Sequence, residues 1–252
     1  MNAGKLARLS VSILVFVGVW WMTSGTFFEA AIVPSPVSVA EKLAEMIWNT
    51  ELFAHLGASL GRIVLGYALG CVIGITVGVA TGAIRLARDL IEPPLEFCRN
   101  IPPVALIPLV VSIFGIGEIG KYFIISYAAG IAVLFNTAAG VASTPQIRVR
   151  AALCLGARKQ DVFMRIVLPS AWPHILTGLR IALGFSFMGV VAAEMLAADQ
   201  GIGFLIMQST NIIAPAEMFV GFLMLGTFGL ITDQLFRMTI HRLMRRYMIP
   251  LA

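Results

Sequence analysis

Long uncharged blocks alternate with short polar stretches along this chain of 252 residues. A helix needs about 20 mostly apolar residues to cross the hydrocarbon core of a bilayer. The blocks therefore predict an all-α membrane protein with six spans, at about residues 9–28, 58–84, 93–115, 121–143, 173–198 and 217–237. For the first block a cleaved signal peptide is the alternative, because it too has a basic start and an apolar core. The length of the block, with Trp20 and Trp21 suited to an interface, favours a span.

One segment after the first block has helical periodicity but is too polar to cross a membrane. Residues 33–36, Val-Pro-Ser-Pro, predict a stiff extended piece. Ser38 with Glu41 three residues later forms a capping-box pattern, which predicts a helix start. We expect an amphipathic helix that lies along the outer membrane surface. Its apolar positions are Leu43, Met46, Ile47 and Phe53.

Glycines recur at every fourth position of the second block, so that they share one face of a helix. They are Gly66, Gly70, Gly74, Gly78 and Gly82. A face without side chains lets a neighbouring helix approach closely. The pattern predicts close packing within the same subunit or, alternatively, against a second copy or a moving gate.

The third block contains Pro102, Pro103 and Pro108. Proline removes a backbone hydrogen bond and disturbs a helix, so this span is expected to be kinked or partly unwound. Inside a bilayer the freed carbonyls need protein or a wet cavity as partners. We therefore place the third span beside a water-accessible pathway.

Basic residues are distributed unevenly over the loops that join the six blocks, and they concentrate on the cytoplasmic side of membrane proteins. Both termini and the polar loop 144–172 are therefore expected in the cytoplasm, and the amphipathic helix outside. The opposite side has only Lys42 and Lys121. The cytoplasmic set is Lys5, Arg8, Arg85, Arg88, Arg148, Arg150, Arg158, Lys159, Arg165, Arg237, Arg242, Arg245 and Arg246.

Composition excludes several classes of function. Only 12% of residues are charged and 59% are hydrophobic, whereas a soluble domain carries roughly a quarter charged residues. The net charge of +5 does not indicate a nucleic-acid binder, because the basic residues lie between apolar runs and do not form one basic face. Neither a disulfide framework nor a metal site is indicated by the scattered Cys71, Cys98, Cys154 and three histidines. No G-x-x-x-x-G-K-[ST] loop occurs, so ATP chemistry of that kind would need a separate protein.

The polar loop after the fourth block carries the most specific pattern of the chain. It reads Arg150-Ala151-Ala152, three residues, Gly156, nine residues, and Ile-Val-Leu-Pro ending at Pro169. This resembles the E-A-A, three, G, nine, I-x-L-P signature of the membrane subunits of ATP-binding-cassette (ABC) importers. The resemblance implies the type I importer permease fold, in which this loop forms a cytoplasmic coupling helix that contacts an ATPase.

Within this coupling segment, small alanines would let a short helix press closely against the ATPase. Gly156 would permit a sharp turn between two helices, and Pro169 would end the second helix. Arg150 stands where the family has glutamate, which puts that contact with the ATPase in doubt. The alternative for the loop is a basic connection bound to anionic lipid. The coupling residues are Arg150, Ala151, Ala152, Gly156, Ala157, Arg158, Lys159, Asp161, Val162, Phe163, Leu168 and Pro169, with Val162 and Phe163 as apolar anchors.

Other segments are similar to the branch of permeases that import nitrate, sulfonates and taurine. This resemblance implies a homodimer in the bacterial inner membrane, two cytoplasmic ATPases that bind ATP and Mg²⁺, and a periplasmic or lipid-anchored binding protein. It implies no cofactor and no catalysis on this chain. The substrate would be a small anion, with a thiamine-precursor pyrimidine or another small nutrient as the alternative. The similar segments are residues 33–36, 99–103, 114–118, 168–169, 193–194 and 201–203.

Polar residues in the spans are candidates for the translocation pathway. Arg99, Arg180 and Glu194 occupy positions where a charge costs about 2.5 to 3.5 kcal/mol on insertion scales, and Asn136 is an uncharged candidate. A straight helix would separate Arg180 from Glu194 by roughly 21 Å, so they cannot pair directly. Glu194 is expected near the outer mouth and the arginines near the inner one. Snorkelling to headgroups or a structural ion pair is the alternative for each.

Two other classes fit the sequence less well. A secondary transporter would need inverted repeats or titratable relays through several spans. A membrane enzyme would call for clustered His, Asp or Glu at one depth. The sequence shows neither clearly, so the permease subunit of an ABC importer is the interpretation that the residues favour.

Overall fold

The computed structural model describes residues 3–27, 29 and 32–243, and every regular element within these residues is a helix. The predicted all-α class is confirmed. Within the described residues, four helices are long and apolar enough to cross a membrane, and a bent helix pair makes a fifth if it is one span. The first predicted span has the shorter apolar stretch Leu14–Thr23, and its last residue, 28, lies outside the described residues. The four are Glu51–Ala83, Glu118–Ala142, Lys159–Leu196 and Pro215–Ile240.

The chain divides into two compact units. The first comprises residues 1–59 and 199–227, and the second comprises residues 60–198 and 228–252. Helices α3 (Glu51–Ala83) and α11 (Pro215–Leu243) each run through both units.

The first unit contains α1 (Ala3–Thr23), α2 (Pro36–Trp48) and α10 (Ile202–Asn211). The indole N–H of Trp20 donates a 3.0 Å hydrogen bond to the carbonyl of Pro34, and the Trp20 ring stacks on a phenylalanine of α11. These contacts tie the end of α1 to the segment that leads into α2. The buried apolar residues of the unit include Val39, Met46, Leu52, Leu56, Leu205 and Val220.

Helix α2 starts earlier than the capping-box pattern predicted. Its N-cap is Ser35 rather than Ser38, because the Ser35 hydroxyl accepts a 3.1 Å hydrogen bond from the backbone N–H of Ser38. The following proline suits the first turn, where its fixed φ is helical and its missing N–H has no intrahelical partner. The predicted apolar face is also only partly right, since Ile47 is exposed and Phe53 belongs to α3.

Side chains of α3 close the N-terminus of α10. The backbone N–H of Gly201 donates to His55 Nδ1 at 3.1 Å, and that of Ile202 donates to Ser59 Oγ at 2.8 Å. The first N–H groups of a helix have no intrahelical acceptor, so His55 and Ser59 cap the helix by accepting these hydrogen bonds. Gly201 has φ +132°, a conformation that favours glycine.

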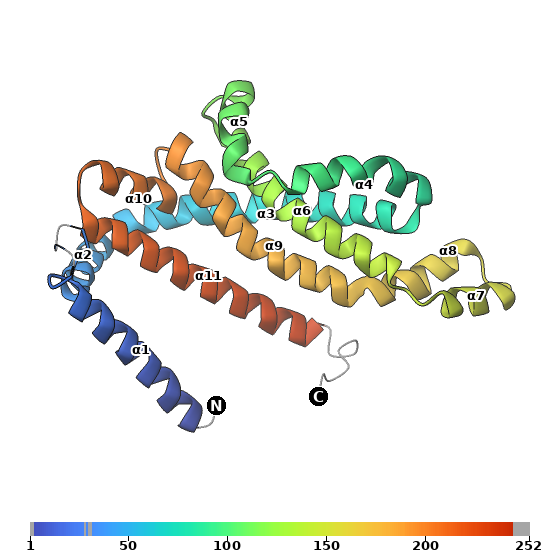
Figure 1. The fold of residues 1–252 in the computed structure, drawn as a ribbon, viewed down its shortest axis with the longest axis horizontal. Helices are drawn as coiled ribbons and strands as arrows, with labels where there is room; N and C mark the ends of the chain where they lie inside the picture. The colour runs from blue at the N-terminus through green and yellow to red at the C-terminus, as the bar shows by residue number, and fades with distance from the viewer. Residues whose placement is uncertain (1–2, 28, 30–31, 244–252) are drawn as a thin grey trace. The chain divides into compact units, whose positions relative to one another are not determined.

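The second unit is built around two long helices, α6 (Glu118–Ala142) and α9 (Leu168–Ala197), which pack along each other (Figure 1). Small residues allow the approach: a Cβ on Gly178 would lie 2.7 Å from the Cβ of Asn136. Buried Ala129, Val133 and Ala182 fill the core between them with Cys71 of α3.

The glycine stripe of α3 lies against α6. A Cβ at Gly70 would lie 2.6 Å from the carbonyl oxygen of Ser126, and one at Gly78 would lie 2.6 Å from that of Leu134. Gly66, Gly74 and Gly82 make equally close approaches to Ile125, Gly130 and Val141. The stripe therefore packs within the subunit, and the space it provides is filled by α6.

The third predicted span is two helices at a steep angle. Helix α4 (Arg85–Arg99) is followed by a short 3₁₀ turn (Pro103–Leu106) and α5 (Ile107–Phe114), and the pair is bent by 94°. The break falls at residues 100–102, whereas Pro108 is accommodated in the first turn of α5. Residues 85–89, which join the second and third predicted spans, begin α4.

Candidate functional site

The coupling segment forms a helical hairpin beyond the ends of α6 and α9 (Figure 1). Its arms are α7 (Gln146–Cys154) and α8 (Lys159–Val162). Gly156 lies in the turn with φ +80°, a conformation that most side chains disfavour. The sharp turn that the sequence predicted at this glycine is thus present.

The second arm of the hairpin runs directly into the long helix that follows. A π-helical stretch (Phe163–Val167) joins α8 to α9, so that residues Lys159–Leu196 form one helical element. Pro169 occupies the first turn of α9 and ends no helix, which corrects the prediction. Because the helical element is continuous here, the missing N–H of Pro169 costs one backbone hydrogen bond directly after the π-helical stretch.

The exposed apolar surface of the hairpin differs from the predicted one. Val162 is only 5% exposed and packs inside the unit, so it cannot anchor a partner as predicted, and Phe163 is half-buried. Leu155, at the turn, is 89% exposed. Ile147, Leu153 and Met164 are also exposed, as are the basic residues Arg148, Arg150, Arg158 and Lys159.

A groove of about 340 Å³ lies on the hairpin and is lined by Ala157, Asp161, Val162, Arg165 and Ile166. Nε of Arg165 lies 3.8 Å from Oδ1 of Asp161, and Asp161 comes one helical turn earlier in the chain. The hairpin therefore offers an apolar tip with a basic surround and an open groove, as a protein-docking surface does.

Four ionisable residues, here called the buried cluster, join α3, α6 and α9 in the second unit. They are Arg62, Glu118, Lys121 and Glu194. Arg62 donates to Glu118 at 2.7 and 2.8 Å and to Glu194 at 2.8 Å. Lys121 donates to Glu118 at 2.8 Å. The side chain of Glu194 is 0% exposed and that of Arg62 9%, so the ion pair between them is shielded from solvent.

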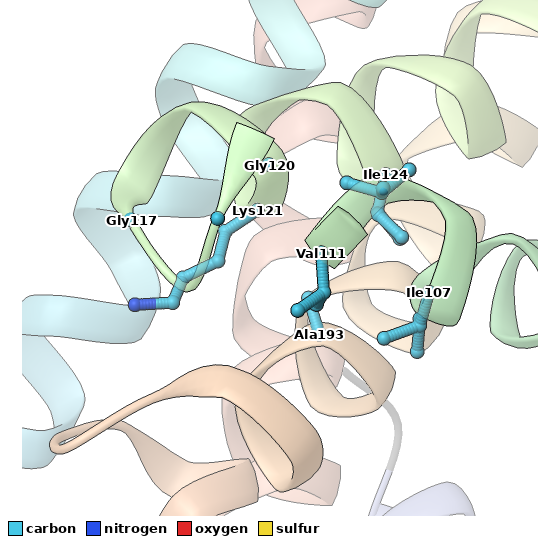
Figure 2. A pocket seen from close by; sticks show the side chains of 9 residues that line it. Ile107, Val111, Gly117, Gly120, Lys121, Ile124 and Ala193 are labelled. Atoms are coloured by element: carbon cyan, nitrogen blue, oxygen red, sulfur yellow. The ribbon is translucent and has the colours of Figure 1, made fainter. Parts of the chain in front are cut away.

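The buried cluster corrects the expectation that Glu194 faces an outer mouth. Its carboxylate points at Arg62 instead, and two cations face two anions, so the cluster has no net charge. A cavity of about 10 Å³, lined by Lys121 among others, has room for about one water. Figure 2 shows that Lys121 extends away from the apolar side chains of Ile107, Val111 and Ala193 that line it.

Three further ionisable residues, here called the open triad, join α9 to the end of α11. They are Arg180, Asp233 and Arg237. Arg180 donates to both carboxylate oxygens of Asp233, at 2.7 and 3.2 Å, and Arg237 donates to the same carboxylate at 2.9 Å. All three side chains are partly exposed, whereas in the buried cluster this holds for Glu118, at 45%, but not for Arg62, Lys121 and Glu194, each at 9% or less.

The remaining pathway candidates have contacts within the second unit. The Arg99 guanidinium lies 4.9 Å from the centre of the Phe135 ring, a cation–π contact at the end of α4. The amide of Asn136 donates to the carbonyl of Ala132 at 2.8 Å, and its Cβ lies against Gly178. The structure therefore brings Arg180 to an acid, Arg99 to an aromatic ring and Asn136 to its own helix, and it does not join the four candidates into one site.

Residues 70–245 match the family of binding-protein-dependent transport system inner membrane components. The chain belongs to this family. Such permeases work with separate ATPase subunits and a binding protein and are not themselves enzymes. The predicted class, a permease subunit of an ABC importer in the inner membrane, is confirmed.

Several permeases are similar over nearly the whole chain. A probable ABC transporter permease of Brucella melitensis is 37% identical, over 96% of this chain and 99% of its own. The taurine transport system permease TauC of Escherichia coli is 36% identical, over 86% and 82%. The nitrate import permease NrtB of Synechocystis is 32% identical, over 91% and 86%.

The fold matches that of a solved importer. The inward-facing MetNI methionine ABC transporter has a chain that superposes with a TM-score of 0.64 at 23% identity, over 81% of this permease and 99% of that chain. The type I importer permease fold predicted from the coupling signature is thereby confirmed.

Sequence reasoning missed most of the charged contacts of this permease. No sequence pattern connects Arg62 with Glu194 or Arg180 with Asp233. One signal was available: Asp233 is an acid inside the predicted sixth span, and an acid in a span calls for a basic partner in another span.

Proposed function

We propose that this permease imports a small oxyanion of the taurine, sulfonate or nitrate type. It would act as a homodimer, with two cytoplasmic ATPases that bind ATP and Mg²⁺ and an external binding protein that delivers the solute. The identities of the relatives support this substrate class, because a taurine permease and a nitrate permease are both more than 30% identical to it.

The observation that carries the proposal is the hairpin of residues 144–172. It presents Leu155 and four exposed basic residues, Arg148, Arg150, Arg158 and Lys159, within the segment that carries the loop signature. The uneven distribution of basic residues supports a cytoplasmic position for this hairpin and for both termini. An ATPase is the partner that this surface fits.

The continuity of the hairpin with α9 supports a mechanism of coupling. When ATP draws the two ATPases together, the hairpin moves with them. Because Lys159–Leu196 is one helical element, a displacement at Lys159 passes to α9 without a flexible joint. Helix α9 contributes to both the buried cluster and the open triad, so its movement changes the surroundings of both.

Helix α2 and a groove beside it support a position for the binding protein. The groove, of about 500 Å³, is lined by Pro34, Ser35, Lys42 and Glu217 among others, all in the first unit. Lys42 bridges Glu217 at 3.0 Å, and hydrogen bonds to Glu217 and then Glu45 raise the pKa of Lys42. The external binding protein would dock on this face.

The turn at Gly156 gives a test. Gly156→Val places a β-branched side chain at φ +80°, which should distort the hairpin. Gly156→Asn is the matched control, because asparagine tolerates a positive φ. We expect normal membrane insertion of both variants, but a loss of about tenfold or more in copurified ATPase and in ATP-dependent uptake of taurine or nitrate for the valine variant alone. Normal ATPase recovery with Gly156→Val would contradict the coupling role.

A further inference from the structure

The open triad carries an excess of positive charge. Two guanidinium groups share the single carboxylate of Asp233, through the hydrogen bonds of Arg180 and Arg237. Guanidinium groups stay protonated at any physiological pH, so the triad has a net charge of one positive unit when Asp233 is ionised. The buried cluster, in contrast, is neutral.

Donors of the open triad remain available. Each arginine has five N–H donors, and the triad uses two from Arg180 and one from Arg237. Within the described part of the chain, no other acceptor bonds to these two side chains. Their side chains are 44% and 55% exposed, so the remaining donors can be approached from outside the subunit.

Open space adjoins the triad on both helices. Gly184 lies one turn beyond Arg180 on α9, and Gly229 lies one turn before Asp233 on α11. A Cβ at either glycine would meet no atom within 4 Å. Glycine weakens a helix relative to alanine, and here no neighbour in the described residues requires its small size. These positions leave room beside the guanidinium groups for a small group from outside the chain.

The position of the triad narrows what that group can be. Arg180 and Asp233 lie within two apolar helices that are long enough to cross a membrane. Exposed charges at such positions face a water-filled cavity or a polar partner rather than lipid chains. The fork of a guanidinium matches the planar or tetrahedral oxygens of an oxyanion through paired hydrogen bonds.

We infer that the open triad is an oxyanion-binding site on the translocation pathway of this permease. The inference rests on the proposed function and gives it a specific site: sulfonate, nitrate or a similar oxyanion contacts the free donors of Arg180 and Arg237. Asp233 holds the two arginines together and, by its negative charge, keeps the anion from binding so tightly that it cannot leave. A lipid phosphate has the same chemistry, and the experiment separates the two sources.

The rates at which charged thiol reagents modify a cysteine beside the triad test for this site, and the assay needs neither ATP hydrolysis nor transport. Cys71, Cys98 and Cys154 are replaced by serine, and Gly184→Cys or, in a second variant, Gly229→Cys introduces one thiol into the open space beside the triad. The permease–ATPase complex is placed in nanodiscs of neutral lipid. The rates of modification by an anionic methanethiosulfonate, which carries a sulfonate, and by its cationic trimethylammonium counterpart are then compared.

We expect the anionic reagent to react faster than the cationic one by about fivefold or more, because the local potential concentrates anions. Arg237→Gln should lower this ratio towards one, and Asp233→Asn should raise it. Nitrate or taurine should protect the thiol in the parent and not in Arg237→Gln. Arg85→Gln, which removes an exposed arginine at the start of α4, is the matched control and should leave the ratio unchanged.

Opposite signs for Arg237→Gln and Asp233→Asn distinguish an anion site from a merely structural ion pair, which both substitutions would weaken in the same direction. The inference is overturned if neither reagent reacts at either cysteine, since the face is then covered by lipid or a second copy. It is overturned equally if the cationic reagent reacts as fast as the anionic one. If the anionic preference disappears when phosphatidylglycerol is added, the occupant is a lipid headgroup and the pathway site is refuted. Because uptake is not measured, failure here leaves the proposed function standing.

Discussion

The buried cluster and the open triad use the same chemistry in opposite ways. Both join arginine to carboxylate across helices, with hydrogen bonds as short as 2.7 Å. In the buried cluster Arg62 meets two carboxylates, Lys121 balances the charge, and Glu194 has no exposed surface. In the open triad one carboxylate is shared between two arginines, and every side chain is partly exposed.

This difference separates a charge pair that stabilises from one that is available to a ligand. A buried pair is costly to form, and removing one partner leaves a charge in a low-dielectric interior. A partly exposed pair is screened by water and adds little stability. The comparison therefore assigns the buried cluster to holding α3, α6 and α9 together, and the open triad to contact with something outside the subunit.

The largest expected effect comes from Arg62→Met, because it leaves Glu194 buried without its cation. Removing one member of a buried pair costs about 3 to 5 kcal/mol. We expect a strong fall in the thermal unfolding midpoint of the detergent-solubilised permease and in the amount of monodisperse protein. The measurement is fluorescence-detected size-exclusion chromatography after heating.

A double variant controls for lost packing. Arg62→Met with Glu194→Met removes both charges, so it should recover part of the stability that Arg62→Met loses. If the double variant is as unstable as the sum of its single changes, the cost lies in lost packing and not in an unpaired buried charge.

Glycine substitutions extend the same contrast to the backbone. Gly78→Ala forces a Cβ to within 2.6 Å of the Leu134 carbonyl oxygen, so α3 and α6 must separate, at a cost of about 1 to 3 kcal/mol. Gly229→Ala, the matched substitution beside the open triad, meets open space and should stabilise α11 by up to about 1 kcal/mol. Unfolding midpoints of the two variants should therefore shift in opposite directions. A shift in the same direction would show that both faces are packed alike.

Local patterns were sufficient to predict the helical blocks, the glycine stripe and the turn at Gly156. Each depends on residues that are close in sequence: a run of apolar residues, a four-residue period, or a family spacing. The resemblance to importer permeases rested on the same short spacings, and the family match and the relatives confirm it. The ends of helices were predicted less well. At α2, the hydroxyls of Ser35 and Ser38 could both form the N-cap, and the proline after Ser35 favours Ser35.

Long-range pairing is what the sequence could not supply. Arg62 and Glu194 are 132 positions apart, and Arg180 and Asp233 are 53 apart, so no periodicity connects them. The direction of a side chain could not be predicted either. The motif suggests that Val162 is an exposed anchor, yet the π-helical stretch after it continues α8 into α9, and Val162 packs inward. These features require the packed helices and not only their residues.

The smallest expected effect on stability is that of Asp233→Asn. The substitution leaves the size of the side chain unchanged and breaks ion pairs whose members are partly exposed, which double-mutant measurements place at about 0.2 to 1 kcal/mol. We expect an unfolding midpoint within about 2 °C of the parent, and a difference that disappears in 0.5 M salt because screening removes most of the exposed Coulomb term. A loss comparable to that of Arg62→Met would mean that Asp233 is a structural counter-ion, and the two clusters would then serve the same purpose. A near-neutral result, combined with an altered preference for anionic reagents, would instead show that the charge of Asp233 acts on an approaching anion and not on the fold.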